Sequence, residues 1–195
     1  MVKKVMDRIK NSGVNLKEVA VSALTLAVIA GAMTAALALT NAVTKDRIEK
    51  INRQAQSDLR KQVIDADTFE EKRFTENGEE VSYYAAKKGN QPVGFVFTVS
   101  STGKSSGLVV MTGISTEGKV TGVVVVEDNE TAGFVDMVRK GGLFDRIAGW
   151  SSDLKLKLGE NIDGVSQATK TTKGITDGVN TAMDYFNTHV KGEVG

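Results

Sequence analysis

The chain has 195 residues, and its 25 Lys and Arg residues nearly balance 24 Asp and Glu residues, giving a formal net charge of +1. A near-neutral chain lacks the surplus of basic charge that binding to a nucleic-acid backbone requires, so no nucleic-acid partner is expected. Because the sequence has no cysteine and one histidine, it excludes disulfides, cysteine-held zinc or iron–sulfur centres and paired-histidine metal sites within this chain.

The first predicted element is an apolar segment near the N-terminus. Residues Val19–Val43 carry no charge, and a helix of that length can cross the hydrocarbon core of a bilayer, which is about 30 Å thick. A buried core helix rarely runs so far without a charge, and the apolar part of a cleaved signal peptide is usually shorter. We therefore predict a transmembrane helix at residues 19–43, preceded at residues 1–18 by a short amphipathic segment on the membrane surface.

Two features of this segment concern its orientation and its neighbours. As many basic residues precede the segment as follow it closely, so the positive charges do not assign its orientation. Small residues recur at every fourth position, at Ala23, Ala27, Gly31 and Ala35, and this spacing lets another helix approach closely in lipid. An alanine-rich helix can also produce the spacing by chance, and both interpretations stay open.

After the apolar segment, the sequence predicts a helical stalk and then one α+β domain. Ile48, Ile51, Leu59 and Val63 keep a helical period through residues 44–66. Residues 67–195 form the predicted domain, which begins with a charged run at residues 67–80 that we interpret as a solvated surface. Alternation and β-branched residues predict strands around the following segments: 81–85, 93–99, 108–112 and 120–126.

The rest of the domain is predicted to be mainly helical. Short helices are expected at residues 134–139 and 143–150, and the alternation of Leu154, Leu156 and Leu158 with lysines predicts a short edge strand. The last helix has the clearest pattern, because its apolar residues share one face that can pack on a sheet. They are Ile175, Val179, Ala182, Met183, Phe186 and Val190.

A cluster of hydroxyl side chains stands where this last helix is expected to begin. The cluster consists of Ser166, Thr169, Thr171 and Thr172. Such residues often cap helices, which is the structural interpretation. Alternatively, the free N–H groups and the helix dipole could bind an anion, with Lys170 and Lys173 adding positive charge. The residues alone leave both interpretations open.

The same segment resembles a known motif. Asp163-x-x-Ser166-x-Ala168-Thr169 resembles the flavinylation motif of the FMN-binding domain family, in which the last hydroxyl receives FMN through a phosphoester. The segments at 106–123 and Glu130–Phe134 resemble other parts of that family. Together with the apolar segment and the following Asn41-x-x-Thr44-Lys45-x-x-Ile48, they resemble the G subunits of Rnf complexes, the ion-translocating ferredoxin:NAD oxidoreductases.

This resemblance implies roles for individual residues. Thr169 would hold FMN covalently, while Ser166, Thr171 and Thr172 would bind its phosphate or cap the helix. Ala168 and Lys170 are also expected to bind the cofactor, and Glu130 and Thr131 are expected to face the flavin. Asp163 would belong to the sequence that the flavin-attaching enzyme recognises. No catalytic residue and no metal ligand is predicted.

The chain departs from the family pattern at three positions. Gln167 stands where the motif usually has glycine, so we expect that the loop cannot use the positive φ that glycine allows. Ala132 replaces a usual proline, and Val135 stands where a second glycine is common. These changes are expected to affect the contacts of the isoalloxazine more than the attachment, because the acceptor hydroxyl is kept.

The resemblance implies an electron-transfer subunit of a membrane-bound, ion-translocating ferredoxin:NAD oxidoreductase. FMN would relay electrons between redox centres, and the partners would be the other membrane and peripheral subunits and the flavin-attaching enzyme. The fold would be a single-pass membrane helix followed by an FMN-binding domain with a mainly antiparallel sheet, on the extracytoplasmic side of the cell membrane. There a covalent tether prevents loss of the flavin by dilution. The alternatives are a non-redox, membrane-tethered assembly or binding module and a free-standing flavoprotein reductase.

Overall fold

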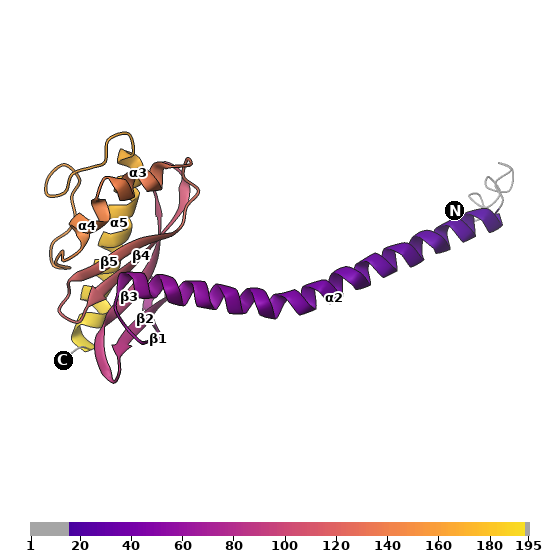
Figure 1. Ribbon diagram of the computed structural model, residues 1–195, viewed down its shortest axis with the longest axis horizontal. Coiled ribbons are helices and arrows are strands. Elements are labelled where there is room, and N and C mark those ends of the chain that lie inside the picture. Colours follow the sequence, from indigo (N-terminus) through magenta and orange to yellow (C-terminus); the bar gives the residue numbers. More distant parts are fainter. Residues whose placement is uncertain (1–15, 194–195) are drawn as a thin grey trace. The chain divides into compact units, whose positions relative to one another are not determined.

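The computed structural model describes residues 16–193, and contacts divide the chain into two units, residues 1–53 and 54–195 (Figure 1). Helix α2 (Leu16–Val63) begins in the first unit and ends in the second. Most of the amphipathic segment predicted at residues 1–18 lies outside the described residues.

The described part of the first unit is the long apolar portion of α2. Within the described residues, one segment, Lys17–Asn41, is long and apolar enough to cross a membrane by length and composition, with a mean hydropathy of 2.0. Its threonines bond to the preceding helical turn: the Oγ1 atoms of Thr25 and Thr34 donate to the carbonyl oxygens of Val21 and Ala30, both at 2.8 Å. These hydroxyls therefore need no water, which suits an apolar surrounding.

The second unit is built on a five-stranded antiparallel sheet in which each strand pairs with the next one along the chain (Figure 1). Its strands are β1 (Thr68–Glu76), β2 (Glu79–Lys88), β3 (Gln91–Thr102), β4 (Ser106–Ser115) and β5 (Val120–Glu127). Helices α3 (Phe134–Lys140), α4 (Leu143–Ile147) and α5 (Thr169–Tyr185) follow. The chain then continues as a π-helical turn, Phe186–Val190, and a 3₁₀ turn, Lys191–Glu193. The predicted α+β class and the sheet packed by helices are confirmed.

The two faces of the sheet bury separate hydrophobic clusters. On one face, Phe97 and Val110 of the sheet pack with Ile175 and Val179 of α5. On the other face, Val96 and Met111 pack with Val63 and Ile64 at the end of α2. Successive residues point to opposite faces of a strand, so β3 and β4, which are covered on both sides, carry continuous apolar runs.

The short strand predicted at Leu154, Leu156 and Leu158 is wrong. This stretch is a loop in which Leu156 is buried and Leu154 is exposed. The side chain of Asn180 on α5 bonds both backbone groups of Leu156, accepting from its N–H at 2.8 Å and donating to its carbonyl oxygen at 2.9 Å. Because an amide side chain satisfies the backbone that a strand neighbour would satisfy, alternation alone was misleading.

The charged run at residues 67–80, interpreted as a solvated surface, contains the edge strand β1. Its charged side chains are largely exposed, but Phe69 and Phe74 are half-buried and pack against the two clusters. Cross-strand ion pairs cover the edge: Lys87 Nζ lies 2.9 Å from Glu70 Oε2, and this hydrogen bond lowers the pKa of the Glu70 carboxyl. Exposed charge on an edge strand also opposes pairing with other chains.

Candidate functional site

The site is built around the first turn of α5. The helix begins at Thr169, and the loop before it is tied to the helix by Thr172, which is fully buried. The Thr172 hydroxyl accepts from the N–H of Val165 at 3.3 Å and donates to the carbonyl oxygen of Ala168 at 2.8 Å. Thr172 thereby fixes the path by which the loop enters the helix.

The loop turns sharply at Gln167, which has a φ of 66°. The N–H of Ala168 donates to the carbonyl oxygen of Val165 at 3.1 Å, so Gln167 occupies the third position of a β-turn, where a positive φ favours glycine. The expectation that glutamine would keep the loop from positive φ is therefore wrong. The closing hydrogen bond and the anchoring by Thr172 hold the backbone there in spite of the side chain.

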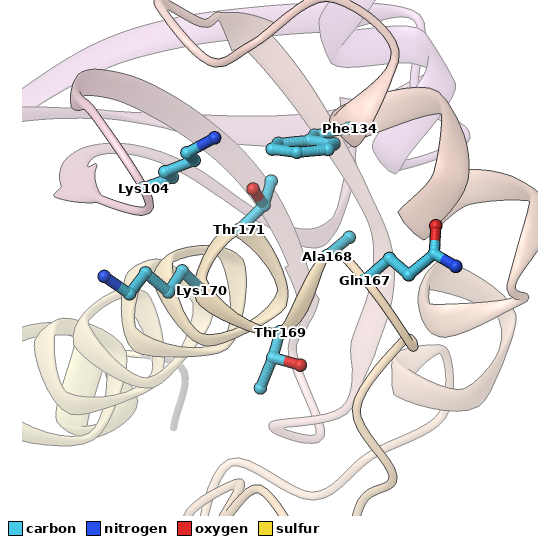
Figure 2. A pocket seen from close by; sticks show the side chains of 7 residues that line it. All are labelled: Lys104, Phe134, Gln167, Ala168, Thr169, Lys170 and Thr171. Carbon is cyan, nitrogen blue, oxygen red and sulfur yellow. The ribbon is translucent and has the colours of Figure 1, made fainter.

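This turn distributes the motif residues between solvent and interior. Ser166, Gln167 and Thr169 are exposed, whereas Ala168 is 2% exposed and Thr171 is 1% exposed. In Figure 2 the Thr169 side chain lies on the opposite side of the backbone from those of Ala168 and Thr171. The turn therefore leaves Thr169 exposed and buries its neighbours Ala168 and Thr171.

A cavity of about 280 Å³ lies at this helix start (Figure 2). Its lining comes from three elements: the turn between β3 and β4, the first residue of α3, and the loop and first turn of α5. The lining residues are Lys104, Phe134, Gln167, Ala168, Thr169, Lys170 and Thr171. The structure therefore brings together four of the predicted site residues, Ala168, Thr169, Lys170 and Thr171.

Glu130 joins the turn between β3 and β4 to α5. One carboxylate oxygen accepts the N–H of Ser105 at 3.0 Å, and the other accepts the Thr171 hydroxyl at 2.6 Å. The same two segments touch through their backbones, because a Cβ at Gly174 would lie 2.7 Å from the Cα of Gly103. Glu130 and this glycine contact hold one wall of the cavity against the other.

The predicted residues that do not line the cavity lie close to it. Ser166 is exposed on the preceding loop, and Thr172 is buried beneath the loop. The Thr131 hydroxyl lies 3.3 Å from Lys104 Nζ and accepts its hydrogen bond. Glu130 is half-buried and is held by its hydrogen bonds to Ser105 and Thr171.

Lys104, Phe134 and Gln167 are lining residues that were not predicted from the sequence. Lys104 Nζ stands 4.7 Å from the centroid of the Phe134 ring, within the range of a cation–π contact. Phe134 belongs to a segment that resembles the FMN-binding domain family, and this was the one available signal. Nothing local to Lys104 marks it, since the turn between β3 and β4 meets α5 only in the folded chain.

The lining of the cavity contains two lysines and no acidic residue. Among the described residues, no carboxylate forms an ion pair with either lining lysine, Lys104 or Lys170. By contrast, lysines elsewhere in the domain are paired, for example Lys155 with Asp184 at 2.8 Å and Lys157 with Glu160 at 3.1 Å. The lining lysines therefore leave their charge available to an anion.

The lining suits a molecule with a phosphate at one end and a flat ring at the other. Thr169 offers an exposed hydroxyl at a helix start, where backbone N–H groups without helical partners favour a phosphate. Phe134 and the methyl group of Ala168 offer apolar contacts to a ring. These groups fit FMN, and the volume is near the lower end of ligand pockets, which hold about 300–1,000 Å³.

Comparison with known proteins gives two family matches along the chain. A family described as FMN-binding domain matches residues 103–184, which include every residue that lines the cavity. A family described as the RnfG N-terminal region matches residues 9–63.

Two curated relatives resemble most of the chain. One is the G subunit of the Na⁺-translocating ferredoxin:NAD⁺ oxidoreductase complex of Acetobacterium woodii. It is 32% identical over 185 residues, covering 84% of this chain and 89% of the relative. The other is the G subunit of the proton-translocating ferredoxin:NAD⁺ oxidoreductase complex of Clostridium ljungdahlii. It is 32% identical over 146 residues, covering 72% of this chain and 76% of the relative.

Proposed function

The chain belongs to the family of RnfG subunits of ion-translocating ferredoxin:NAD oxidoreductase complexes, and we propose that it holds FMN covalently on Thr169 to relay electrons within such a complex. Its FMN-binding domain is shown by the family match. The covalent bond, the residue that forms it and the relay are the proposal. The position of Thr169 supports it: Thr169 is an exposed residue on the lining of a cavity that also contains two lysines, whereas the nearby Thr171 and Thr172 are buried and hydrogen-bonded.

The residues of the first helical turn would hold the phosphate end. Thr169 would contribute its hydroxyl oxygen to the phosphoester, and the N–H groups of the turn would donate to the remaining phosphate oxygens. Lys170, the next residue on the helix, adds a positive charge to the lining at this helix start. Thr172 acts from beneath, since its two hydrogen bonds fix the loop and with it the direction of the helix start.

The other walls would hold the ring end. Phe134 offers an aromatic face, and Ala168 offers a small apolar surface that leaves room for a ring. When bound, FMN supplies the redox chemistry of this site, and the protein supplies position and electrostatics. Exposure of Gln167, Thr169 and Lys170 leaves the cavity accessible, as exchange of electrons with a neighbouring subunit requires.

We infer the membrane anchor and the partners from membership in the family. In the proposed arrangement, residues 19–43 cross the cell membrane once, residues 44–66 form a stalk, and residues 67–195 are extracytoplasmic. The other membrane and peripheral subunits of the complex would be the electron partners, and a flavin-attaching enzyme would recognise the loop that contains the exposed Asp163. A covalent bond suits this location, because a reversibly bound flavin would dissociate at low external concentration.

Intact mass of the purified full chain tests the covalent bond. After co-expression with its flavin-attaching enzyme, the chain should gain the mass of FMN less one water, because the phosphoryl group replaces the hydroxyl hydrogen of Thr169. Thr169→Ala should abolish the gain, and Thr181→Ala, which changes a threonine later on α5, should keep it.

Three results would each contradict a part of the proposal. A native chain without added mass would leave a non-redox, membrane-tethered assembly module as the better interpretation. Retention of the added mass in Thr169→Ala would move the attachment to another hydroxyl. Purification without any other subunit of the complex would instead favour a free-standing reductase.

A further inference from the structure

We propose that Lys104 is the cation that faces the isoalloxazine of the bound FMN and raises its midpoint potential by favouring the reduced form. This inference rests on the proposed attachment at Thr169 and adds a residue to it. Three observations support the inference: Lys104 lines the cavity, it contacts Thr131 and Phe134, and among the described residues it has no ion-pair partner.

The backbone of Lys104 is held from both sides. Gly103 lies against α5, since a Cβ at Gly174 would stand 2.8 Å from the nitrogen of Gly103. On the other side, Ser105 donates its N–H to Glu130 Oε1 at 3.0 Å, and its carbonyl oxygen accepts from the N–H of Gly103 at 3.2 Å. Lys104 is thus the tip of a turn that is fixed against the element carrying Thr169.

The side chain of Lys104 is directed by two contacts. Its ammonium donates to the Thr131 hydroxyl at 3.3 Å and stands 4.7 Å from the centroid of the Phe134 ring. Figure 2 shows Lys104 and Phe134 near each other, with the Thr171 side chain toward them and that of Thr169 pointing away. The cation therefore belongs to the aromatic wall of the cavity.

In the proposed complex, Lys170 and Lys104 serve different ends of the ligand. Lys170 follows Thr169 directly on the helix and belongs to the same wall of the cavity as the attachment residue. Lys104 comes from another element and, of the two, is the one in contact with the aromatic ring. A ring that packs on Phe134 would therefore have Lys104 as its near cation.

A cation at this place would act on the equilibrium of the flavin. Reduction adds electrons, so a fixed positive charge beside the ring favours the reduced form, and an uncompensated charge does so more strongly. Thr131 is a neutral partner and leaves the charge of Lys104 intact. Glu130 does not line the cavity, and its two oxygens bind Ser105 and Thr171.

Reductive titration of the full chain carrying FMN tests the proposal. Lys104→Met keeps most of the side-chain length and removes the charge, and Lys104→Arg keeps the charge. We expect Lys104→Met to lower the midpoint potential by an amount that corresponds to an about tenfold weaker preference for reduced flavin, or about 30 mV for a two-electron couple. Lys104→Arg should restore most of the difference.

The matched control is Lys140→Met, which removes an exposed lysine at the end of α3 that does not line the cavity. Its midpoint potential should equal that of the unchanged chain. Intact mass is measured on every variant, and Lys104→Met should carry FMN as fully as the unchanged chain.

The outcomes separate this proposal from the attachment. An unchanged potential in loaded Lys104→Met would overturn it, as would an equal decrease in Lys140→Met. Loss of the FMN mass in Lys104→Met, with Lys140→Met still loaded, would also overturn it and assign Lys104 to the attachment. Absence of the mass in the unchanged chain would instead contradict the covalent bond itself.

Discussion

Leucine side chains in the apolar part of α2 are exposed, whereas leucines in the core of the domain that follows are buried. Leu37 is 72% exposed and Leu39 is 69% exposed, whereas Leu108 and Leu143 are fully buried. Among the described residues, none of the apolar window within Lys17–Asn41 is buried, so the hydrophobic effect can stabilise this segment only through an apolar surrounding from outside the described part of the chain. The domain supplies its own apolar surrounding from both faces of its sheet.

Leucine thus occurs in two different environments, the exposed surface of the apolar segment and the packed core of the domain. In the domain, an apolar residue is fixed by neighbours that pack closely, and removing it leaves a cavity. In the apolar segment, what counts is the transfer of the whole helix into lipid, so charge matters more than shape. The predictions that follow test this difference, beginning with the largest effect.

A leucine-to-alanine substitution should destabilise the domain when it is made in the core and should leave the stability of the domain unchanged when it is made in the apolar segment. Leu143→Ala should lower the free energy of unfolding of the domain by about 2–5 kcal/mol, because it removes a fully buried side chain from the core. Leu37→Ala should leave that quantity unchanged. Thermal unfolding of the full chain in detergent, followed by near-ultraviolet circular dichroism, measures both. A similar loss in both variants would show that the helix and the domain unfold as one unit.

A charge in the centre of the apolar segment should affect membrane insertion and leave the domain intact. Ile29→Arg should disfavour insertion by about 3 kcal/mol, since arginine at the middle of a membrane helix is costly. Ile29→Leu is the matched control and should insert like the unchanged chain. The inserted fraction in a membrane translation assay checks this, and full insertion of Ile29→Arg would contradict a transmembrane role for the segment.

The smallest effect is expected inside the candidate site. Gln167→Gly should raise the stability of the domain by about 0.5–1 kcal/mol, because relief of a left-handed conformation exceeds the added chain entropy. Asn77→Gly, at a φ of 51°, is the comparison and should gain less, since asparagine tolerates that region. Chemical denaturation measures the two. A loss of stability in Gln167→Gly would mean that the glutamine side chain supports the turn.

Much of the fold was predictable because its signals are local. An uninterrupted run without charge indicates the apolar helix, and the apolar face from Ile175 to Phe186 indicates the helix that covers the sheet. Alternation predicted β2 and β3 correctly. Strand β1 was missed because its charges dominate the pattern, although Phe69 and Phe74 anchor it. The predicted strand at Leu154 failed because Asn180, distant in the sequence, bonds the backbone there.

The sequence by itself determined the apolar segment, the α+β class and the hydroxyl-rich start of the last helix with Thr169. Each depends on residue types at short spacing, which the chain carries whatever its tertiary structure. Only the tertiary structure decided that Lys104 and Phe134 meet at that helix start and that Gln167 adopts a positive φ. Lys104 and Phe134 meet there because Glu130 and the close backbone contact at Gly174 join the turn between β3 and β4 to α5. The positive φ of Gln167 is held by hydrogen bonds of the folded loop, from Ala168 to Val165 and between Thr172 and the loop backbone, which override the preference of the single residue.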